Sequence, residues 1–284
     1  MKKTRLIALL LAAILVLGAF AGCSSKKESD SSAKTSGKEA SEEADSTTIT
    51  GIVDLVPHND LIEFVKDQVE EQGYTIDIVS TASDETTNEK IATGEITFSF
   101  NQHWPYLAEW NETNGFDLVN AGDIHIEPIT AYSDKYTTVD EIPADAVVAI
   151  PNDGTNEYRA LRILEQNGFI KLDPETATSL KASAADVVEY LKPIEIVELD
   201  SAQIIPTKDD YEFFITNTNK ALEAKIESAR LFSEGDDSPY ANIITTTAEN
   251  KDNPAIVALV EALRSDETKA FIEEKYNGAV IPAK

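Results

Sequence analysis

Strand-like and helix-like segments alternate along most of this chain, which limits it to a small number of fold classes. Residues 49–56, 75–79 and 146–150 are rich in β-branched residues. Between the first two, residues 59–72 place their apolar side chains on one helical face: Leu61, Ile62, Val65 and Val69. Strands that alternate with helices are typical of a parallel sheet covered by helices. We therefore predict an α/β body.

The alternating region is long for a single hydrophobic core. It runs from residue 49 to residue 284, whereas a typical single-core domain has roughly 100–150 residues. It contains no internal repeat and no long linker between successive domains. We therefore predict two lobes with the chain crossing between them. Residues 49–130 plus 243–284 would form one lobe and residues 131–242 the other.

The N-terminal segment has the parts of a secretory signal. Lys2, Lys3 and Arg5 precede an apolar stretch over residues 6–21, and small residues then lead to Cys23. The stretch is short for a membrane-spanning helix, which needs about 20 apolar residues. Small residues followed by Cys are what a lipoprotein signal peptidase accepts. A buried free thiol is the alternative for a lone Cys, but Cys23 lies between an apolar signal and a polar tract.

Cleavage before Cys23 would leave a lipid-anchored chain. We predict that residues 1–22 are removed, that Cys23 carries the lipid and that residues 23–48 form a tether. Residues 24–48 contain no aromatic and no branched aliphatic side chain, so they bury too little apolar surface to offset chain entropy and should be disordered. Acyl chains would hold the protein at the outer face of the cytoplasmic membrane.

The charge balance excludes several classes of partner. Asp and Glu number 51 against 24 Lys and Arg, which gives a net charge of −27. Nucleic-acid phosphates and anionic lipid head groups repel such a chain, so we expect no nucleic-acid partner. A single Cys excludes an internal disulfide, and three scattered His add too few soft ligands for a zinc or iron–sulfur site. We expect neither a metal nor another cofactor.

Motifs of covalent catalysis are missing from the sequence. There is no Gly-x-Ser-x-Gly elbow, no phosphate loop, no Gly-rich dinucleotide fingerprint and no His-Glu-x-x-His helix. In a chain this acidic, carboxylates meet by chance, so neighbouring acids do not indicate a glycosidase. His58, His103 and His125 lie in separate segments, which favours structural or ligand-contacting roles over a metal site. We predict no enzyme activity and no catalytic residues.

Polar residues at the ends of predicted strands are the candidates for ligand binding, because α/β folds bind ligands there. Residues 152–159 follow a buried strand and open a helix, so that Thr155 or Asn156 can cap it and Arg159 lies near its start. A helix N-terminus together with a guanidinium suits a carboxylate. The alternatives are a surface ion pair for Arg159 and a capping role alone for Asn156.

A second candidate pair is Asn217 and Asn219, which follow the predicted strand over residues 212–215. Their carboxamides can offer donors and acceptors to the ammonium and carboxylate groups of an amino acid. Turn-forming residues are an equally good interpretation of both.

Aromatic residues supply two more candidates. Within residues 98–106, Phe100 and Trp104 flank polar His103 and can line an apolar pocket, although core packing is the commoner role. Residues 126–132 can form a crossing between lobes with Tyr132 facing a cleft, or a plain surface loop.

The chain resembles the NlpA lipoprotein family, the methionine-binding (MetQ-like) lipoproteins of ABC importers. The resemblance covers residues 52–283 and rests on long motifs, among them Gln102-His103 with Pro105-Tyr106-Leu107, Ile150-Pro151-Asn152-Asp153, Asn217-x-Asn219-x-Ala221-Leu222 and Ser238-Pro239-Tyr240-Ala241-Asn242. It implies a two-lobed periplasmic-binding-protein fold, type II-like, in which each lobe is a sheet flanked by helices and the cleft holds an amino acid. It places these residues in the pocket: His103, Tyr132, Asn156, Arg159, Asn217 and Asn219.

Three positions depart from the pattern of methionine-binding members. Asn101 replaces the second residue of a Tyr-Phe pair, Lys220 replaces a Tyr, and the segment around Ser83 lacks an aromatic. Burying these polar groups against a thioether would leave donors unpaired, at a cost of about 1–3 kcal/mol each. We therefore expect a ligand with a polar side chain to bind better than methionine. The alternative is that the three residues point away from the cleft.

These observations lead us to predict a lipid-anchored solute-binding protein. It would bind an amino acid, methionine or a related small zwitterion, and pass it to an ABC permease and its ATPase. Arg159 would bind the carboxylate, Asn217 and Asn219 would contact the backbone polar groups, and three aromatics would form apolar walls: Phe100, Trp104 and Tyr132. The alternative is an extracytoplasmic enzyme or an adhesin.

Overall fold

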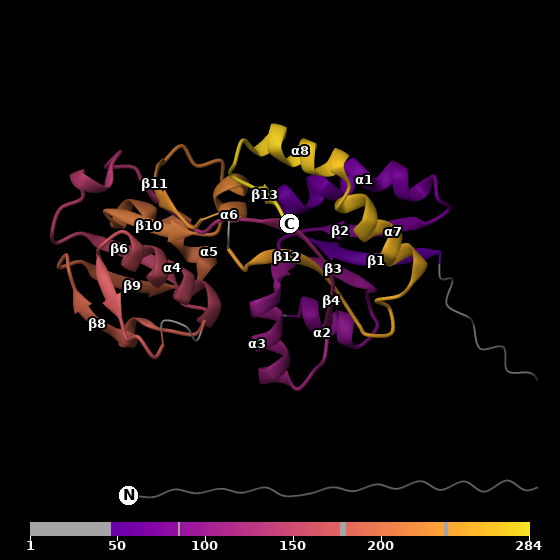
Figure 1. Ribbon diagram of the computed structural model, residues 1–284, viewed down its shortest axis with the longest axis horizontal. Helices are drawn as coiled ribbons and strands as arrows, with labels where there is room; N and C mark the ends of the chain where they lie inside the picture. Colours follow the sequence, from indigo (N-terminus) through magenta and orange to yellow (C-terminus); the bar gives the residue numbers. More distant parts are fainter. Residues whose placement is uncertain (1–46, 85, 177–179, 236–237) are drawn as a thin grey trace, which may run out of the picture. The chain divides into compact units, whose positions relative to one another are not determined.

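The computed structural model describes residues 47–84, 86–176, 180–235 and 238–284 (Figure 1). The predicted signal peptide, the lipidated Cys23 and nearly all of the predicted tether lie outside these residues. Within the described ranges, none of the helices has the length and apolar character needed to cross a membrane.

The first sheet has six strands in the order β13-β4-β12-β3-β1-β2. Their bounds are β1 (Thr48–Val53), β2 (Thr75–Ser80), β3 (Phe98–His103), β4 (Val119–Ile126), β12 (Ala241–Thr246) and β13 (Ile281–Pro282). β1 runs parallel to β2 and β3, whereas β12 is antiparallel to both β3 and β4. The sheet is therefore mixed and not purely parallel, because β12 enters it on returning from the second sheet.

Helices cover both faces of the first sheet (Figure 1). One face packs on α1 (Asp60–Glu70), α7 (Pro254–Leu263) and α8 (Asp266–Tyr276), and the other on α2 (Thr87–Ala92) and α3 (Trp104–Asn114). The apolar spacing predicted for α1 is confirmed, since Leu61, Ile62, Val65 and Val69 are its buried residues. They join the main core of this sheet, where Phe98 and Phe100 also lie.

The second sheet has five strands in the order β11-β5-β10-β6-β9. Their bounds are β5 (Thr130–Ser133), β6 (Val147–Pro151), β9 (Glu195–Leu199), β10 (Phe213–Thr216) and β11 (Ala229–Ser233). β6 runs parallel to β9 and β10, while β5 is antiparallel to β10 and β11. A separate antiparallel pair is formed by β7 (Ile170–Leu172) and β8 (Val187–Tyr190).

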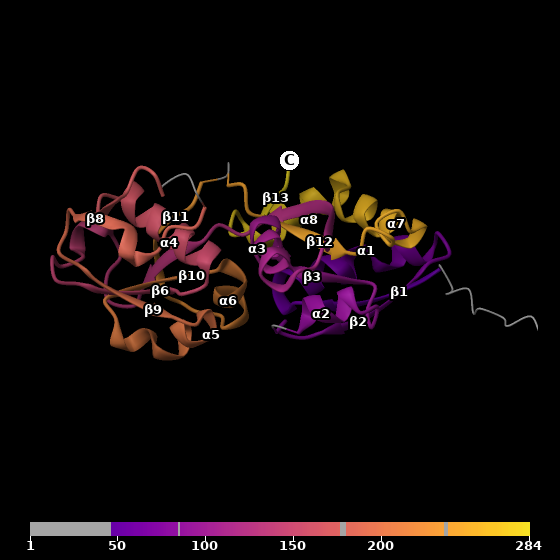
Figure 2. The same ribbon diagram turned by 90° about the horizontal axis from the view of Figure 1, so that it is seen from below.

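The second sheet has its own helices and its own cores (Figure 2). The helices are α4 (Gly154–Gln166), α5 (Ser201–Ile204) and α6 (Thr218–Glu223). Ala160, Leu161, Ile163 and Leu164 of α4 pack into the larger of these cores. The described residues also form four short helical turns: η1 (Leu55–Asn59), η2 (Val139–Glu141), η3 (Ala184–Asp186) and η4 (Ile205–Asp210).

The chain passes from one sheet to the other twice. It leaves the first sheet after Ile126 and enters the second at Thr130, and it returns between Ser233 and Ala241. We propose that these crossings separate two lobes, one with residues 49–130 and 243–284 and the other with residues 131–242.

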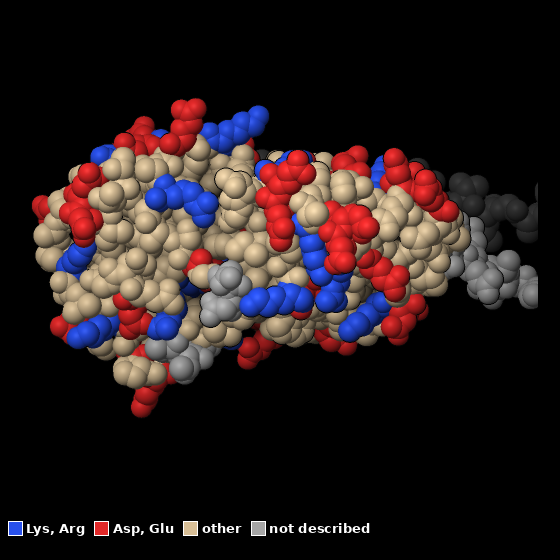
Figure 3. Space-filling view, turned by 45° about the horizontal axis from the view of Figure 1, so that its top comes forward, with Lys and Arg blue, Asp and Glu red and all other residues tan. Residues whose placement is uncertain are grey.

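Acidic side chains are spread over the face of the molecule shown in Figure 3, with basic ones between them.

Candidate ligand-binding site

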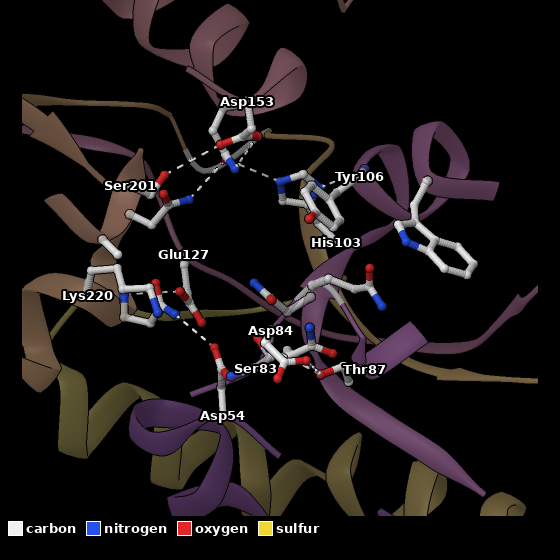
Figure 4. Close-up of a pocket in the computed structure, with 18 of the residues that line it drawn as sticks. Asp54, Ser83, Asp84, Thr87, His103, Tyr106, Glu127, Asp153, Ser201 and Lys220 are labelled. Carbon is white, nitrogen blue, oxygen red and sulfur yellow. Dashed lines mark hydrogen bonds between the residues drawn. The ribbon is translucent and has the colours of Figure 1, made fainter. Parts of the chain in front are cut away.

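A cavity of about 580 Å³ is lined by residues of both sheets and their helices (Figure 4). Its wall is built largely from strand ends: His103 ends β3, Asn152 and Asp153 follow β6, Asp200 follows β9 and Asn217 follows β10. This is where α/β folds place their ligands. The volume lies within the roughly 300–1,000 Å³ of typical small-molecule sites.

Asp153 is the residue that caps α4. Its Oδ1 accepts hydrogen bonds from the backbone N–H of Asn156 at 3.1 Å and from Asn156 Nδ2 at 2.9 Å. The expectation that Thr155 or Asn156 caps this helix was wrong, because the carboxylate one position before the helix takes that role. Asn156 Oδ1 is instead held by Asn217 Nδ2 at 3.0 Å and by Arg159 Nη1 at 3.2 Å.

Arg159 is a buried side chain of the cavity wall. It is 2% exposed, its Nη2 donates to Glu234 Oε2 at 2.6 Å and to the carbonyl oxygen of Glu127 at 2.8 Å, and its Nε donates to Glu234 Oε1 at 3.2 Å. The guanidinium also lies 4.4 Å from the centre of the Tyr240 ring. A surface ion pair is therefore excluded for Arg159. Its position is fixed before any ligand binds, which is the preorganisation that carboxylate recognition needs.

His103 is held in one tautomer at the start of α3. Its Nδ1 accepts a hydrogen bond from the backbone N–H of Tyr106 at 3.2 Å, so the proton lies on Nε2, which is 3.4 Å from Asn156 Oδ1. Burial, with the positive charge of Arg159, lowers the pKa of His103 to about 3. The imidazole is thus neutral at physiological pH.

The buried His103 predicts a dependence of stability on pH. Its folded pKa lies below the value of about 6.5 in the unfolded chain, so as pH falls below 6.5 the unfolded state takes up a proton that the folded state does not. This costs about 1.4 kcal/mol per pH unit down to the folded pKa. In His103→Asn, whose side-chain oxygen can still cap α3, this contribution is absent. Between pH 7 and pH 5, the free energy of unfolding measured with urea should fall by about 2 kcal/mol more in the parent than in the variant. An equal change in the free energy of unfolding with pH in the two proteins would contradict a neutral, buried His103.

Asn219 links the two sheets across the cavity. Its backbone N–H donates to Glu127 Oε2 at 3.1 Å, and its Nδ2 donates to Asp54 Oδ2 at 3.3 Å. Asp54 follows β1, and its Oδ1 accepts from the backbone N–H of Ser83 at 2.6 Å. Asn217 and Asn219 therefore do more than form a turn.

Two of the three histidines meet Glu127 in a buried cluster. His125 Nε2 lies 2.7 Å and His58 Nε2 3.4 Å from Glu127 Oε1, and His58 Nε2 is also 3.1 Å from Asn242 Oδ1. These histidines come from separate segments of the sequence and meet because the sheet order brings β4 and β12 together beside η1. Burial lowers the pKa of both histidines and raises that of Glu127.

The histidine cluster has the donor set of a cation site but lacks its usual support. The Nε2 atoms and a carboxylate oxygen lie within 4.8 Å of one another. Metal-bound histidines normally donate their second ring nitrogen to an acceptor, yet Nδ1 of His58 and of His125 has no hydrogen-bond partner in the part of the chain that the structure describes. The geometry fits a hydrogen-bonded cluster around the Glu127 carboxylate better than a metal site.

Two of the aromatic residues expected in the pocket lie elsewhere. Phe100 is fully buried in the core of the first sheet, with its ring 4.6 Å from that of His58. Tyr132 is 6% exposed and stacks on Phe214 at 5.8 Å. Neither lines the cavity. The pairing of β3 with β12 shifts register between Phe100 and Gln102, so residues 98 and 100 face the core while residues 101–103 line the cavity.

Different aromatic residues form the apolar part of the wall. Tyr106 and Trp110, one turn apart on α3, both line the cavity. Trp104, the third expected wall residue, is 44% exposed and lines a separate surface depression. Sequence reasoning also missed the carboxylates of the wall, although Asp54 and Asp153 follow strands and the strand-end rule could have found them.

The three positions that depart from the methionine-binding pattern all face the cavity. Ser83, Asn101 and Lys220 are among its lining residues. The alternative, that they point away from the cleft, was therefore wrong.

The structure has two mixed sheets, each with its own helices, joined by two crossings around a polar cavity. This is the architecture of periplasmic substrate-binding proteins, as predicted. The solved structures most like this one include a nutrient-binding protein from Burkholderia cenocepacia bound to methionine, which is 32% identical, has a TM-score of 0.78 and spans 83% of this chain and 100% of its own. Residues 50–284 match the NlpA lipoprotein model. The chain belongs to the NlpA lipoprotein family, which confirms the predicted resemblance.

Relatives of known sequence agree with this placement. The membrane lipoprotein TpN32 of Treponema pallidum is 34% identical over 230 residues, which are 80% of this chain and 85% of the relative. The methionine-binding lipoprotein MetQ of Bacillus subtilis is 32% identical over an alignment of 289 positions, gaps included, that covers 99% of each chain.

Proposed function

We propose that this protein is the lipid-anchored solute-binding component of an ABC importer and that it binds an amino acid in the cavity. The observation that carries the proposal is the fixed Arg159 at the cavity wall, beside the carboxamides of Asn156 and Asn217, in a chain of the NlpA lipoprotein family. A guanidinium with neighbouring amides suits the carboxylate and ammonium groups of a zwitterion.

The wall residues would divide the recognition between them. Arg159 Nη1, whose bond to Asn156 uses one of its two N–H groups, would donate to the ligand carboxylate. Asn217 and Asn219 would contact the ammonium and carboxylate groups, and neutral His103 would contribute its Nε2–H. Movement about the crossings, at residues 127–129 on one and at residues 234–235 and 238–240 on the other, would close the cavity, exclude water and strengthen each of these contacts.

The named relatives support transport and offer no support for catalysis. The Bacillus subtilis relative is named a methionine-binding lipoprotein, and a similar structure from Coxiella burnetii is described as a periplasmic substrate-binding protein of an ABC transporter. We propose no covalent step here: the ligand would leave unchanged for a permease and its ATPase.

A thermal-shift screen tests the proposal against the alternatives of an enzyme and an adhesin. The full-length lipoprotein in detergent would be heated with each of the twenty amino acids, in L and D form, at equal concentration. A ligand at 100 times its dissociation constant stabilises the folded state by about 2.7 kcal/mol, so binding raises the midpoint measurably. Stabilisation by at least one amino acid is expected, and a screen in which none shifts the midpoint would contradict the proposal.

The anchor is a separate part of the proposal and has its own test. We propose that Cys23 becomes the lipidated N-terminus and holds the protein at the outer face of the cytoplasmic membrane. Cys23→Ala should leave the precursor uncut or release the protein from membranes, because the acyl chains supply the attachment. Membrane fractionation with immunoblotting checks this. Normal processing and retention of the variant would show that the lipoprotein signal was misidentified.

A further inference from the structure

Carboxylates outnumber basic groups on the wall of the cavity. Among the described residues, two basic side chains line it, Arg159 and Lys220, against five acidic ones: Asp54, Asp84, Glu127, Asp153 and Asp200. Burial raises the pKa of two of these acids, Glu127 and Asp153. His103 adds no charge at physiological pH because its pKa is lowered to about 3.

Both basic groups already have acidic partners behind the wall. Arg159 pairs with Glu234 at 2.6 Å, and Lys220 Nζ lies 4.0 Å from Glu223 Oε2. Neither Glu234 nor Glu223 lines the cavity. These pairs offset the two positive charges, so the field inside the cavity is set by the carboxylates of its wall and attracts cations.

Asp84 offers a carboxylate oxygen that is free to bind a ligand. Its Oδ1 accepts from the backbone N–H of Thr86 at 2.9 Å and from Thr86 Oγ1 at 2.6 Å, and these bonds lower its pKa. Its Oδ2 has no hydrogen bond to any other described residue. Figure 4 shows Asp84 beside Ser83 and Thr87, on the side of the cavity opposite Asp153 and Ser201. The positive charge of Lys90 also helps to lower this pKa, so the ionised form of Asp84 is favoured. The side chain is exposed, with Oδ1 held by Thr86.

Two further features of the cavity wall suit a cation that donates hydrogen bonds. Asn101 Oδ1 is buried and has no hydrogen-bond partner among the described residues, which leaves an acceptor unsatisfied. Tyr106 and Trp110 add aromatic rings, whose faces attract ammonium and guanidinium groups. A thioether donates no hydrogen bond, so it would leave the acceptors Asp84 Oδ2 and Asn101 Oδ1 without a donor.

A neutral zwitterion would leave Asp84 without a partner. The ligand carboxylate would take Arg159 and the α-ammonium would take one carboxylate, and Asp84, whose pKa is lowered, would keep a further negative charge on the wall. We propose that the ligand is an amino acid with a basic side chain, of the lysine, ornithine or arginine type, whose distal cation binds at Asp84. This inference rests on the proposed function and specifies the ligand of the same site.

Calorimetry with two ligands of matched shape tests the inference. L-Lysine and L-norleucine have the same carbon chain, and only lysine carries the ε-ammonium. On the full-length lipoprotein in detergent at low salt, lysine should bind at least tenfold more tightly than norleucine or methionine. If norleucine or methionine binds as tightly as lysine, the inference is overturned while the proposed function stands. If no amino acid binds, both fail.

A charge variant locates the cation. Asp84→Asn keeps the shape of the side chain and should reduce the lysine-to-norleucine preference at least fivefold. Asp67→Asn, on the exposed side of α1, removes the same charge far from the cavity and should leave the preference unchanged. An unchanged preference in Asp84→Asn would overturn the placement of the cation. The ratio on the unaltered protein decides the ligand class even if the variant fails to fold.

Discussion

Arg159→Ala is expected to weaken both ligand binding and the folded state. The guanidinium is buried and holds Glu234, Asn156 and the carbonyl of Glu127. Removing one partner of a buried pair leaves an uncompensated charge, which typically costs about 3–5 kcal/mol of stability. Loss of the contact with the ligand carboxylate should also weaken binding by about 2–5 kcal/mol, which is the usual cost of removing one partner of a buried, hydrogen-bonded charge pair.

Arg162→Ala is the matched control for this substitution. Arg162 lies one turn further along α4, pairs with Glu165 and has a side chain that is 33% exposed. Partly exposed ion pairs at this spacing contribute about 0–1 kcal/mol, so Arg162→Ala should change stability little and affinity not at all. Calorimetry and urea unfolding on the three proteins measure both quantities. If Arg159→Ala and Arg162→Ala behave alike, Arg159 has no role in recognition.

Phe100→Ala and Trp110→Ala should separate the core from the cavity wall. Phe100 is fully buried against His58 and His125, and deleting such a ring costs about 3–5 kcal/mol of stability. Trp110 lines the cavity and stacks on Phe116 at 5.2 Å, so its removal should cost less stability.

The effects of the two substitutions on binding should be the reverse. Loss of the Trp110 ring should reduce ligand affinity by about 1 kcal/mol, the size of one aromatic or cation–π contact. Phe100→Ala should bind ligand with near-parental affinity at temperatures where it stays folded. Denaturant titrations and calorimetry on each variant give the two numbers. A large loss of affinity in Phe100→Ala with little loss of stability would restore the role that the sequence predicted for this residue.

Local patterns in the sequence were sufficient for the fold class and for the general position of the site. The 3.6-residue spacing of apolar side chains predicted the buried face of α1, and polar residues after buried strands predicted where the cavity lies. Both inferences depend on neighbours within one element, which a single sequence records. The direction of β12 depends on a return from the other sheet, and no local pattern specifies it.

Contacts between distant segments could not be predicted from the sequence. Arg159 meets Glu234 over 75 residues, and nothing local distinguishes Glu234 from the many other acids of the chain. His58 and His125 meet because β4, β12 and β3 are neighbours in the sheet. Phe100 was misplaced because alternation along a strand separates two faces without indicating which of them borders a cavity.

Native mass spectrometry tests amino-acid binding at this site most directly. The full-length lipoprotein would be incubated with an equimolar mixture of the twenty amino acids and then released from detergent in the spectrometer. We predict one added mass per chain, equal to that of an amino acid, and its loss in Arg159→Ala but not in Arg162→Ala. A spectrum without any adduct, or the same adduct on Arg159→Ala, would contradict the assignment of this cavity as an amino-acid site.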